Sequence, residues 1–201
     1  MKKTTKPQRP SADSTRQKIL CSALKLFIQN GYAGTSMGKL AELADVNQSL
    51  IFHHFGDKQN LWQQVKASLV SETNVEPINP TPNSLAEFLS EAIQQRISIY
   101  TNRPELARLI SWQRLEPVKR SQQLAGIPKS PTAPHQWLIP IKYLQQQGKL
   151  KQELMPECVL TWIVTSVNGL IMDDHGIFKH QDENQQKYIQ MIINGLTKAL
   201  K

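Results

Sequence analysis

Three adjacent polar side chains, Asn47, Gln48 and Ser49, have the chemistry needed to contact nucleic acid. The amide of Gln48 can donate and accept hydrogen bonds at the major-groove edge of adenine. Its two neighbours could meet base edges or phosphates, although Asn47 could instead do no more than turn the chain. Gln48 is therefore the first candidate for base recognition.

Hydroxyl and basic side chains on both sides of these residues suit the phosphate backbone. Thr35 and Ser36 stand at the expected start of a helix, where free N–H groups and the helix dipole favour phosphate. Ser36 could also cap that helix, and the two roles are compatible. Lys39 lies in the same helix and Lys58 begins another, so both add positive charge. Such contacts would position a protein on DNA without reading its sequence.

Two short helices joined by a tight connection are expected to carry these side chains. One runs from the cap at Ser36 to Ala44, and the other from Gln48 to His54. Asp45, in the connection, can adopt the left-handed conformation that glycine adopts more easily. The small and apolar residues expected between the helices are Ala41, Ala44, Leu40, Leu43, Val46 and either Leu50 or Ile51. A pair of this kind places its second helix in the major groove.

Apolar residues at three- and four-residue spacing predict helices along the rest of the chain, and no alternating strand pattern is found. The first helix ends at Asn30-Gly31. Later helices are expected from Lys58, over 84–100, from Pro104, over 134–147, from Pro156 and over 182–200. The predicted fold class is all-α, with a disordered basic arm over 1–10, a three-helix helix-turn-helix DNA-binding domain over 11–60 and a larger helical domain over 61–201.

The formal net charge of +8 favours a polyanionic partner, nucleic acid before an acidic membrane surface. Nine basic and four acidic residues lie up to Asn60, so +5 of this charge belongs to the N-terminal part. The two cysteines, Cys21 and Cys158, form no paired motif, which fits a reducing cytoplasm. The apolar stretch 159–172 contains four polar residues and is too short for a membrane span, so no membrane partner is expected.

The segment from Ser14 to about Leu61 resembles the DNA-binding domain of the TetR-type (tetracycline-repressor-type) transcriptional regulators. The similar run is QKILCSALKLFIQNGYAGTSMGKLAELADVNQSLIFHHFGDKQNLW. It contains the helix ending in Asn-Gly-Tyr, the Thr35-Ser36 start, the Leu40-Ala41 pair, and an aromatic-x-His-Phe block followed by a lysine. In one departure, Asp45 stands where that family usually has glycine.

Two further departures concern the expected DNA contacts. Phe52 stands where the family usually has tyrosine, so the phosphate contact of that phenol should be missing. Ser49-Leu50 replaces a common Gly-Thr type of pair, which leaves the details of base reading open. The resemblance places His53 near the backbone phosphates, and it implies that His54 and Phe55 help to lock the recognition helix.

The resemblance implies a homodimer whose two recognition helices lie about one helical turn of DNA apart, ~34 Å, on an inverted-repeat operator. In most members a small molecule binds the C-terminal domain and releases the DNA. Such a ligand must prefer the conformation that cannot span both half-sites. The chain is therefore expected to be a cytoplasmic repressor of transcription, with activation left open. It is expected to use no cofactor and to be no enzyme.

The larger C-terminal domain is expected to bind the ligand and to dimerise through its last two long helices. The residues assigned to the dimer, which could equally form only an intramolecular core, are Ile163, Val167, Leu170, Ile171, Ile189, Ile192, Ile193 and Leu196. The residues assigned to a ligand pocket are Phe88, Arg96, Tyr100, Trp112, Trp137, Trp162, Asn168 and Met172. Each aromatic among them could instead be ordinary core.

Other interpretations have weaker support in the sequence. Asp173, Asp174, His175 and His180 resemble a loose set of metal ligands, but neighbouring carboxylates at a helix end are more often solvated, and no metal is expected. No nucleophile elbow, phosphate loop or paired-cysteine motif points to catalysis. The alternative function is a helical ligand-binding module without sequence-specific DNA binding. A steep salt dependence with sequence preference would separate the regulator from that module.

Overall fold

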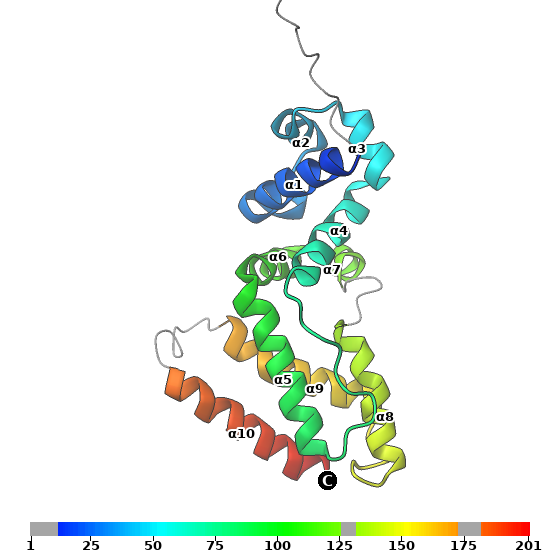
Figure 1. Ribbon diagram of the computed structural model, residues 1–201, viewed down its shortest axis with the longest axis vertical. Helices are drawn as coiled ribbons and strands as arrows, with labels where there is room; N and C mark the ends of the chain where they lie inside the picture. The colour runs from blue at the N-terminus through cyan, green and yellow to red at the C-terminus, as the bar shows by residue number, and fades with distance from the viewer. Residues whose placement is uncertain (1–11, 126–131, 173–181) are drawn as a thin grey trace, which may run out of the picture. The chain divides into compact units, whose positions relative to one another are not determined.

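The computed structural model describes residues 12–125, 132–172 and 182–201, and every regular element within these ranges is a helix (Figure 1). The elements are α1 (Ala12–Gly34), α2 (Met37–Ala44), α3 (Gln48–Phe55), α4 (Lys58–Ser71), α5 (Leu85–Asn102), α6 (Pro104–Leu115), α7 (Val118–Leu124), the 3₁₀ turn η1 (Pro134–Trp137), α8 (Leu138–Gln146), α9 (Pro156–Met172) and α10 (Asp182–Leu200). The all-α prediction is confirmed. No helix in the described ranges is long and apolar enough to cross a membrane.

The chain divides into two compact units. Their boundaries differ from the domain boundary expected at residue 60. Unit 1 contains the described residues up to Lys66 together with Arg108–Ala125. Unit 2 contains Ala67–Ala107 and the described residues from 132 onward. Both α4 and α6 begin in one unit and end in the other. The expected basic arm, residues 1–10, lies outside the described residues.

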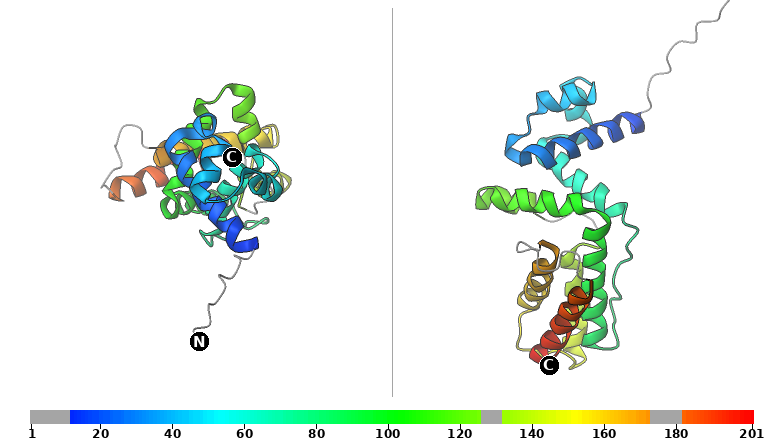
Figure 2. Two further views of the ribbon diagram at one scale, coloured as in Figure 1. Left: turned by 90° about the horizontal axis from the view of Figure 1, so that it is seen from above. Right: turned by 90° about the vertical axis from the view of Figure 1, so that its left-hand side faces the viewer.

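The core of unit 1 comes from apolar side chains at helical spacing on α1 to α4, where α1 packs on α2 and α2 on α3 (Figure 2). The residues that are almost completely buried are Ile19, Leu20, Ala23, Phe27, Leu40, Ala44, Ile51, Phe55, Leu61, Trp62 and Val65. Phe27 and Trp62 meet edge to face, with ring centroids 4.9 Å apart. Burying each large side chain stabilises the fold by roughly 1.5–3 kcal/mol, so this core holds the two short helices in place.

Gly31 breaks α1 near its end, as the Asn-Gly pair predicts, with φ 68° and ψ −174°. Trp112 of α6 lies directly against it, and a Cβ at residue 31 would come within 2.7 Å of Trp112 Cε3. The indole Nε1 donates a hydrogen bond of 2.9 Å to the Ile28 carbonyl, which also accepts from Arg108 Nε at 3.2 Å. Trp112 therefore supports the end of α1 in unit 1, while its assignment to a ligand pocket stays a prediction.

Two polar side chains on one face of α4, Gln63 and Lys66, hold the carbonyl end of α7. Gln63 Nε2 donates to the carbonyls of Gln123 and Ala125, both at 3.1 Å. Lys66 Nζ donates to the Leu124 carbonyl and, at 3.2 Å, to Gln113 Oε1. The last carbonyls of a helix have no partner within the helix and carry partial negative charge, so amide and ammonium donors stabilise them. Burial lowers the pKa of Lys66 to about 7.

The core of unit 2 forms where α5 packs against α9 and α10, with α8 against α9 (Figures 1 and 2). Most of the apolar residues assigned to a dimer interface belong to this core. Ile163 and Val167 are completely buried, and Ile192, Ile193 and Leu196 are nearly so. A side chain without exposed surface in one chain cannot contact a second chain, so Ile163 and Val167 belong to the intramolecular core. A dimer contact at the other three residues stays a prediction. Leu170 is also buried, while Ile171 and Ile189 pack partly buried at the edge.

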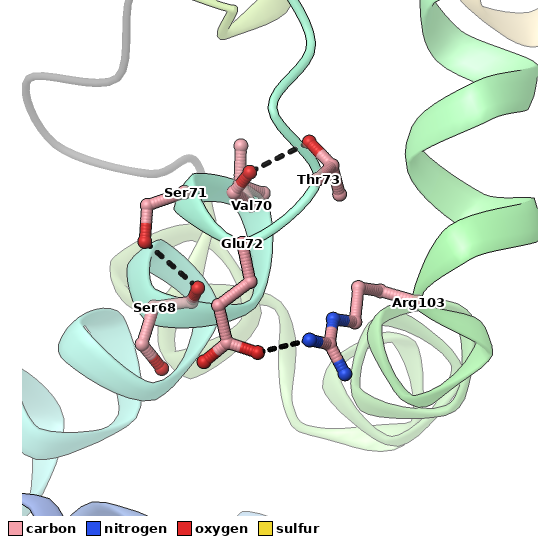
Figure 3. A network of polar contacts seen from close by, with 6 residues as sticks. All are labelled: Ser68, Val70, Ser71, Glu72, Thr73 and Arg103. Carbon is pink, nitrogen blue, oxygen red and sulfur yellow. Dashed lines mark hydrogen bonds and ion pairs between the residues drawn. The ribbon is translucent and has the colours of Figure 1, made fainter.

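The end of α4 is closed by local hydrogen bonds and one ion pair in unit 2 (Figure 3). The hydroxyl of Ser71 donates to the Ser68 carbonyl at 2.9 Å, and that of Thr73 to the Val70 carbonyl at 2.7 Å. Glu72 pairs with Arg103, which ends α5 just before α6 begins at Pro104. The last turn of α4 is therefore tied to the α5–α6 corner.

Replacing Gly31 by alanine should destabilise unit 1 by roughly 2–4 kcal/mol, because alanine is strained at this φ and would collide with Trp112. Denaturant unfolding followed by tryptophan fluorescence measures the change. The matched control is Gly38→Ala in α2, where a Cβ meets nothing within 4 Å and helix propensity favours alanine by up to about 1 kcal/mol. Equal effects of the two changes would contradict the assigned role of Trp112.

Lys66 should make the free energy of unfolding rise with pH between about 7 and 10.5. In that window the unfolded chain holds a proton that the folded chain has lost, and the slope from one group reaches about 1.4 kcal/mol per pH unit. Below pH 7 both states are protonated and the slope ends. Urea titrations of Lys66→Met at several pH values should show a flatter dependence than wild type. Lys142→Met, at an exposed lysine of α8, should keep the wild-type slope.

Candidate nucleic-acid interface

The two hydroxyl residues at the start of α2, Thr35 and Ser36, have different roles. Ser36 is exposed and caps the helix, accepting a 3.1 Å hydrogen bond from the Lys39 N–H. Thr35 is only 2% exposed, and its hydroxyl donates to the Gly31 carbonyl at 2.7 Å. In contrast to the expectation, the Thr35 hydroxyl closes the kink in α1 and is not presented to a phosphate. Ser36 and Lys39 remain on the surface.

Asp45 ends α2 in the left-handed conformation, with φ 49° and ψ 53°, as the sequence predicts. Its N–H donates to the Glu42 carbonyl at 3.1 Å, and the Val46 N–H donates to the Ala41 carbonyl at 3.0 Å. The carboxylate lies 3.3 Å from Lys18 Nζ, and both side chains are largely exposed. The connection is therefore tight without the usual glycine.

Asn47 caps α3, the expected recognition helix. Its side-chain Oδ1 accepts hydrogen bonds from the Leu50 N–H and from the Ser49 hydroxyl, both at 2.7 Å. The amide nitrogen of Asn47 has only donors and is not used in this cap. Asn47 thus sets the direction of α3, while Gln48 next to it is exposed.

The two faces of α3 have opposite surroundings. Ile51 and Phe55 are buried in the core of unit 1. Gln48, Phe52 and His53 lie on the exposed side, and Phe52 keeps 41% of its surface accessible. Among the apolar residues expected between the helices, Leu43 was misplaced, because it is 48% exposed on α2. The structure therefore brings Gln48, Ser49, Phe52 and His53 together on one accessible surface.

Arg16 of α1 is a supporting residue that the sequence interpretation missed. Its guanidinium lies 5.4 Å from the centre of the Phe55 ring and donates to Gln64 Oε1. The His54 ring lies 6.1 Å from Phe55, which agrees with a role in holding the end of α3. The available signal was the position of Arg16, three residues before the buried Ile19 on the same side of α1.

Lys58 begins α4 and is half-buried. Its Nζ lies 4.5 Å from the centre of the Tyr32 ring, in a cation–π contact. Burial lowers the pKa of Lys58, partly offset by the nearby carboxylate of Glu116. That carboxylate also accepts a 3.0 Å hydrogen bond from the Ala33 N–H and pairs with Arg120. Lys58 therefore has a fixed position beside the end of α1.

The residues assigned to a ligand pocket fall into different surroundings in unit 2. Trp137 and Phe88 are core residues, and the Trp137 Nε1 donates to Gln95 Oε1 at 3.2 Å. Trp162 is 46% exposed on α9, and Met172 is half-buried at the end of that helix. None of these four side chains lines the cavity described below for unit 2.

That cavity has a volume of about 180 Å³ and lies between α5, α6, α9 and α10. Its apolar walls are Ile97, Pro104, Ala107, Leu170 and Ile171. Tyr100 lines it as expected, and Arg96 Nη2 donates to the Tyr100 hydroxyl and to Asn168 Oδ1, both at 3.2 Å. Tyr100 is thus the one residue of the expected pocket set that lines this cavity, and Arg96 and Asn168 are joined to it by hydrogen bonds. The loose metal-ligand set, Asp173, Asp174, His175 and His180, lies outside the described residues.

The geometry defines a helix-turn-helix unit with an exposed second helix, and comparison with known proteins places it in a family. The family model described as "Bacterial regulatory proteins, tetR family" matches residues 19–65. A second, described as "Tetracyclin repressor-like, C-terminal domain", matches residues 93–192. The chain belongs to the TetR family, which confirms the resemblance found in the sequence.

Curated relatives agree with this result. The HTH-type transcriptional regulator AcrR of Shigella flexneri is 42% identical over 64 residues, which are 32% of this chain and 29% of that protein. The HTH-type transcriptional repressor AcnR of Corynebacterium diphtheriae is 25% identical over 167 residues, 78% of either chain. The chain therefore spans less than a third of AcrR but most of AcnR.

Solved structures show the same fold over nearly the whole chain. A TetR family transcription regulator from Marinobacter aquaeolei VT8 superposes with a TM-score of 0.64 at 19% identity, covering 96% of this chain and 98% of that one. At this identity the likeness concerns the fold alone.

Proposed function

We propose that this chain is a DNA-binding transcriptional repressor that acts as a homodimer in the cytoplasm and leaves an inverted-repeat operator when a small molecule binds. The observation that carries the proposal is the two-faced α3. Ile51 and Phe55 hold it in the core while Gln48, Phe52 and His53 stay exposed. An eight-residue helix held in this way can enter the major groove with its N-terminal end foremost.

Base reading is assigned to Gln48, with Ser49 and the amide nitrogen of Asn47 beside it. Phe52 has no phenol to donate to a phosphate, and its exposed ring suits an apolar contact such as a thymine methyl group. Ser36, Lys39, His53 and Lys58 are assigned to the backbone. Because Lys58 is already oriented by Tyr32, it would lose little side-chain entropy on meeting a phosphate.

The dimer is proposed to form on the exposed sides of α9 and α10, since their buried sides are used within the chain. Trp162 on α9 and Met191 on α10 are the exposed large apolar residues of these two helices, at 46% and 61% accessibility. Aromatic and methionine side chains are enriched in protein interfaces. A two-fold pairing of these faces would give a four-helix bundle and place two α3 helices on one duplex.

Release of DNA by a ligand is proposed to use α6. Pro104 and Ala107 of this helix line the cavity of unit 2, while Trp112 on the same helix supports Gly31 and Ile28 in unit 1. A helix transmits displacement along its axis because its backbone hydrogen bonds keep it stiff. A ligand that shifts α6 would therefore change the support of α1, and the affinity for DNA would fall if that shift favours a state unable to span both half-sites.

Selection of bound DNA from a random pool tests the proposal as a whole. The expected result is an enriched inverted repeat with half-sites about one helical turn apart. Recovery of unrelated sequences, with a steep salt dependence only, would contradict sequence-specific regulation.

Gln48→Ala should weaken binding to the selected operator by about 1–3 kcal/mol and binding to random DNA very little, because the lost amide contacts a base edge. Fluorescence anisotropy at fixed salt measures both affinities. Gln146→Ala, at an exposed glutamine at the end of α8, is the control and should change neither. Equal weakening on both DNAs would mean that Gln48 touches only the backbone.

Lys58→Met should weaken binding to all DNAs alike and reduce the slope of log affinity against log salt by about one unit, as expected for one phosphate contact. Methionine keeps an unbranched chain over the Tyr32 ring, so unfolding measurements should show little loss of stability. Lys142→Met removes the same charge from α8 and should leave the slope unchanged. A wild-type slope in Lys58→Met would rule out the phosphate contact.

A further inference from the structure

The caps of the two short helices leave their serine side chains with opposite hydrogen-bonding capacity. The Ser36 hydroxyl accepts from the Lys39 N–H at 3.1 Å, so its own proton is not used by the cap of α2. The Ser49 hydroxyl does the reverse, because it donates to Asn47 Oδ1 at 2.7 Å. A hydroxyl group has one proton and two lone pairs. Ser36 can therefore still donate to a further partner, whereas Ser49 can only accept.

The direction of the Ser49 hydrogen bond follows from the other contact of the same cap. The Leu50 N–H, which can only donate, meets the same Asn47 atom at 2.7 Å. That atom must be the amide oxygen, which has no proton, so the Ser49 hydroxyl must be the donor. Turning the hydroxyl toward another acceptor would break this bond at the N-terminus of a helix of only eight residues. The cap thus fixes Ser49 as an acceptor.

Ser49 lies at the end of α3 that would approach the bases. It is exposed in the first turn of the helix, directly after Gln48. Phe52 and His53, three and four positions further on, share its side of the helix and are also exposed. The N-terminal residues of a recognition helix are the ones that contact base edges. The lone pairs of Ser49 would therefore face the major groove.

Few groups of a DNA duplex can donate a hydrogen bond to such an acceptor. Phosphate oxygens only accept, and so do guanine N7 and O6, adenine N7 and thymine O4. The donors that the major groove presents are the amino groups at adenine N6 and cytosine N4. At the position of Ser49, a phosphate or a keto oxygen would place two acceptors against each other.

We infer that Ser49 is a specificity-determining residue that accepts a hydrogen bond from an exocyclic amino group, on adenine or cytosine, in each operator half-site. The inference rests on the proposed function and deepens it by naming the chemical group that one position of the half-site must present. Ser36, which keeps its proton, is the matched case of a hydroxyl suited to phosphate.

The test uses the operator that the wild-type chain enriches from a random DNA pool. In one half-site at a time, single adenines are replaced by N6-methyladenine and single cytosines by N4-methylcytosine. Each methyl group replaces the amino hydrogen that faces the major groove and leaves the hydrogen used in base pairing. Fluorescence anisotropy compares wild type with Ser49→Ala, and Ser49→Thr is a second variant that keeps a hydroxyl. Circular dichroism checks that the variants are folded.

Ser49→Ala should weaken operator binding about fivefold for each half-site, as expected for one neutral hydrogen bond, and random DNA very little. Ser49→Thr should bind nearly as wild type does. Methylation of one base in the half-site should weaken wild type about fivefold or more and leave Ser49→Ala unaffected. Whether that base is adenine or cytosine identifies the source of the amino group. Methylation of an adenine read by Gln48 should weaken both proteins alike.

Ser36→Gly is the control, since glycine is a tolerated cap and the change removes only the hydroxyl that is free to donate. It should weaken operator and random DNA alike and respond to every methylated base as wild type does. A methylation effect that disappears in Ser36→Gly as well as in Ser49→Ala would mean that the two serines do not differ, and it would overturn the inference.

Three other outcomes would overturn the inference while the enriched operator, and with it the proposed function, stands. They are wild-type operator affinity in Ser49→Ala, equal weakening of operator and random DNA with a smaller salt slope, and methylation effects that are the same in wild type and Ser49→Ala at every base. The second of these would assign Ser49 to a phosphate. A wild-type chain that enriches no inverted repeat would contradict the proposed function, and the inference would fall with it.

Discussion

The attachment of α3 to the rest of unit 1 is the constraint on which the other features depend. A helix of eight residues is too short to be stable by itself, because the free-energy cost of helix nucleation exceeds the stabilisation that so few backbone hydrogen bonds provide. Burial of Ile51 and Phe55 and the cap at Asn47 provide the missing stability. Because only one face is used for attachment, the other is free to carry Gln48, Phe52 and His53. Stability and recognition are thus divided between two faces of one helix.

Residues far along the chain complete the unit that holds α3. Trp112 and Glu116, on α6 and just after it, hold the end of α1 through the carbonyl of Ile28 and the N–H of Ala33. Gln63 and Lys66 hold the carbonyl end of α7 in the same unit. The helix-turn-helix therefore depends on segments that the family pattern of residues 19–65 does not include. In the proposed release of DNA, a change in α6 would act on α1 without any change in α3 itself.

The cavity of unit 2 is where a ligand would act in the proposed release of DNA. Pro104 and Ala107 of α6 form part of its wall, next to the polar group of Arg96, Tyr100 and Asn168. Arg103 in the adjoining corner pairs with Glu72 at the end of α4 (Figure 3). The corner between α5 and α6 is therefore where an occupied cavity would meet α6, which continues into unit 1. Differential binding energy at this corner is what a regulator of this kind requires.

The sequence by itself determined the helices other than α7, the cap at Ser36, the left-handed Asp45 and the exposed Gln48, because these depend on local spacing and side-chain chemistry. It also selected Tyr100 as a candidate wall of a pocket, and Arg96 and Asn168 as candidate polar groups. Only the tertiary structure decided that Trp112 supports Gly31, that Thr35 is buried and that Ile163 and Val167 belong to the chain's own core. Periodicity shows which face of a helix is apolar, but what covers that face depends on segments distant in the chain, whose positions no local pattern contains.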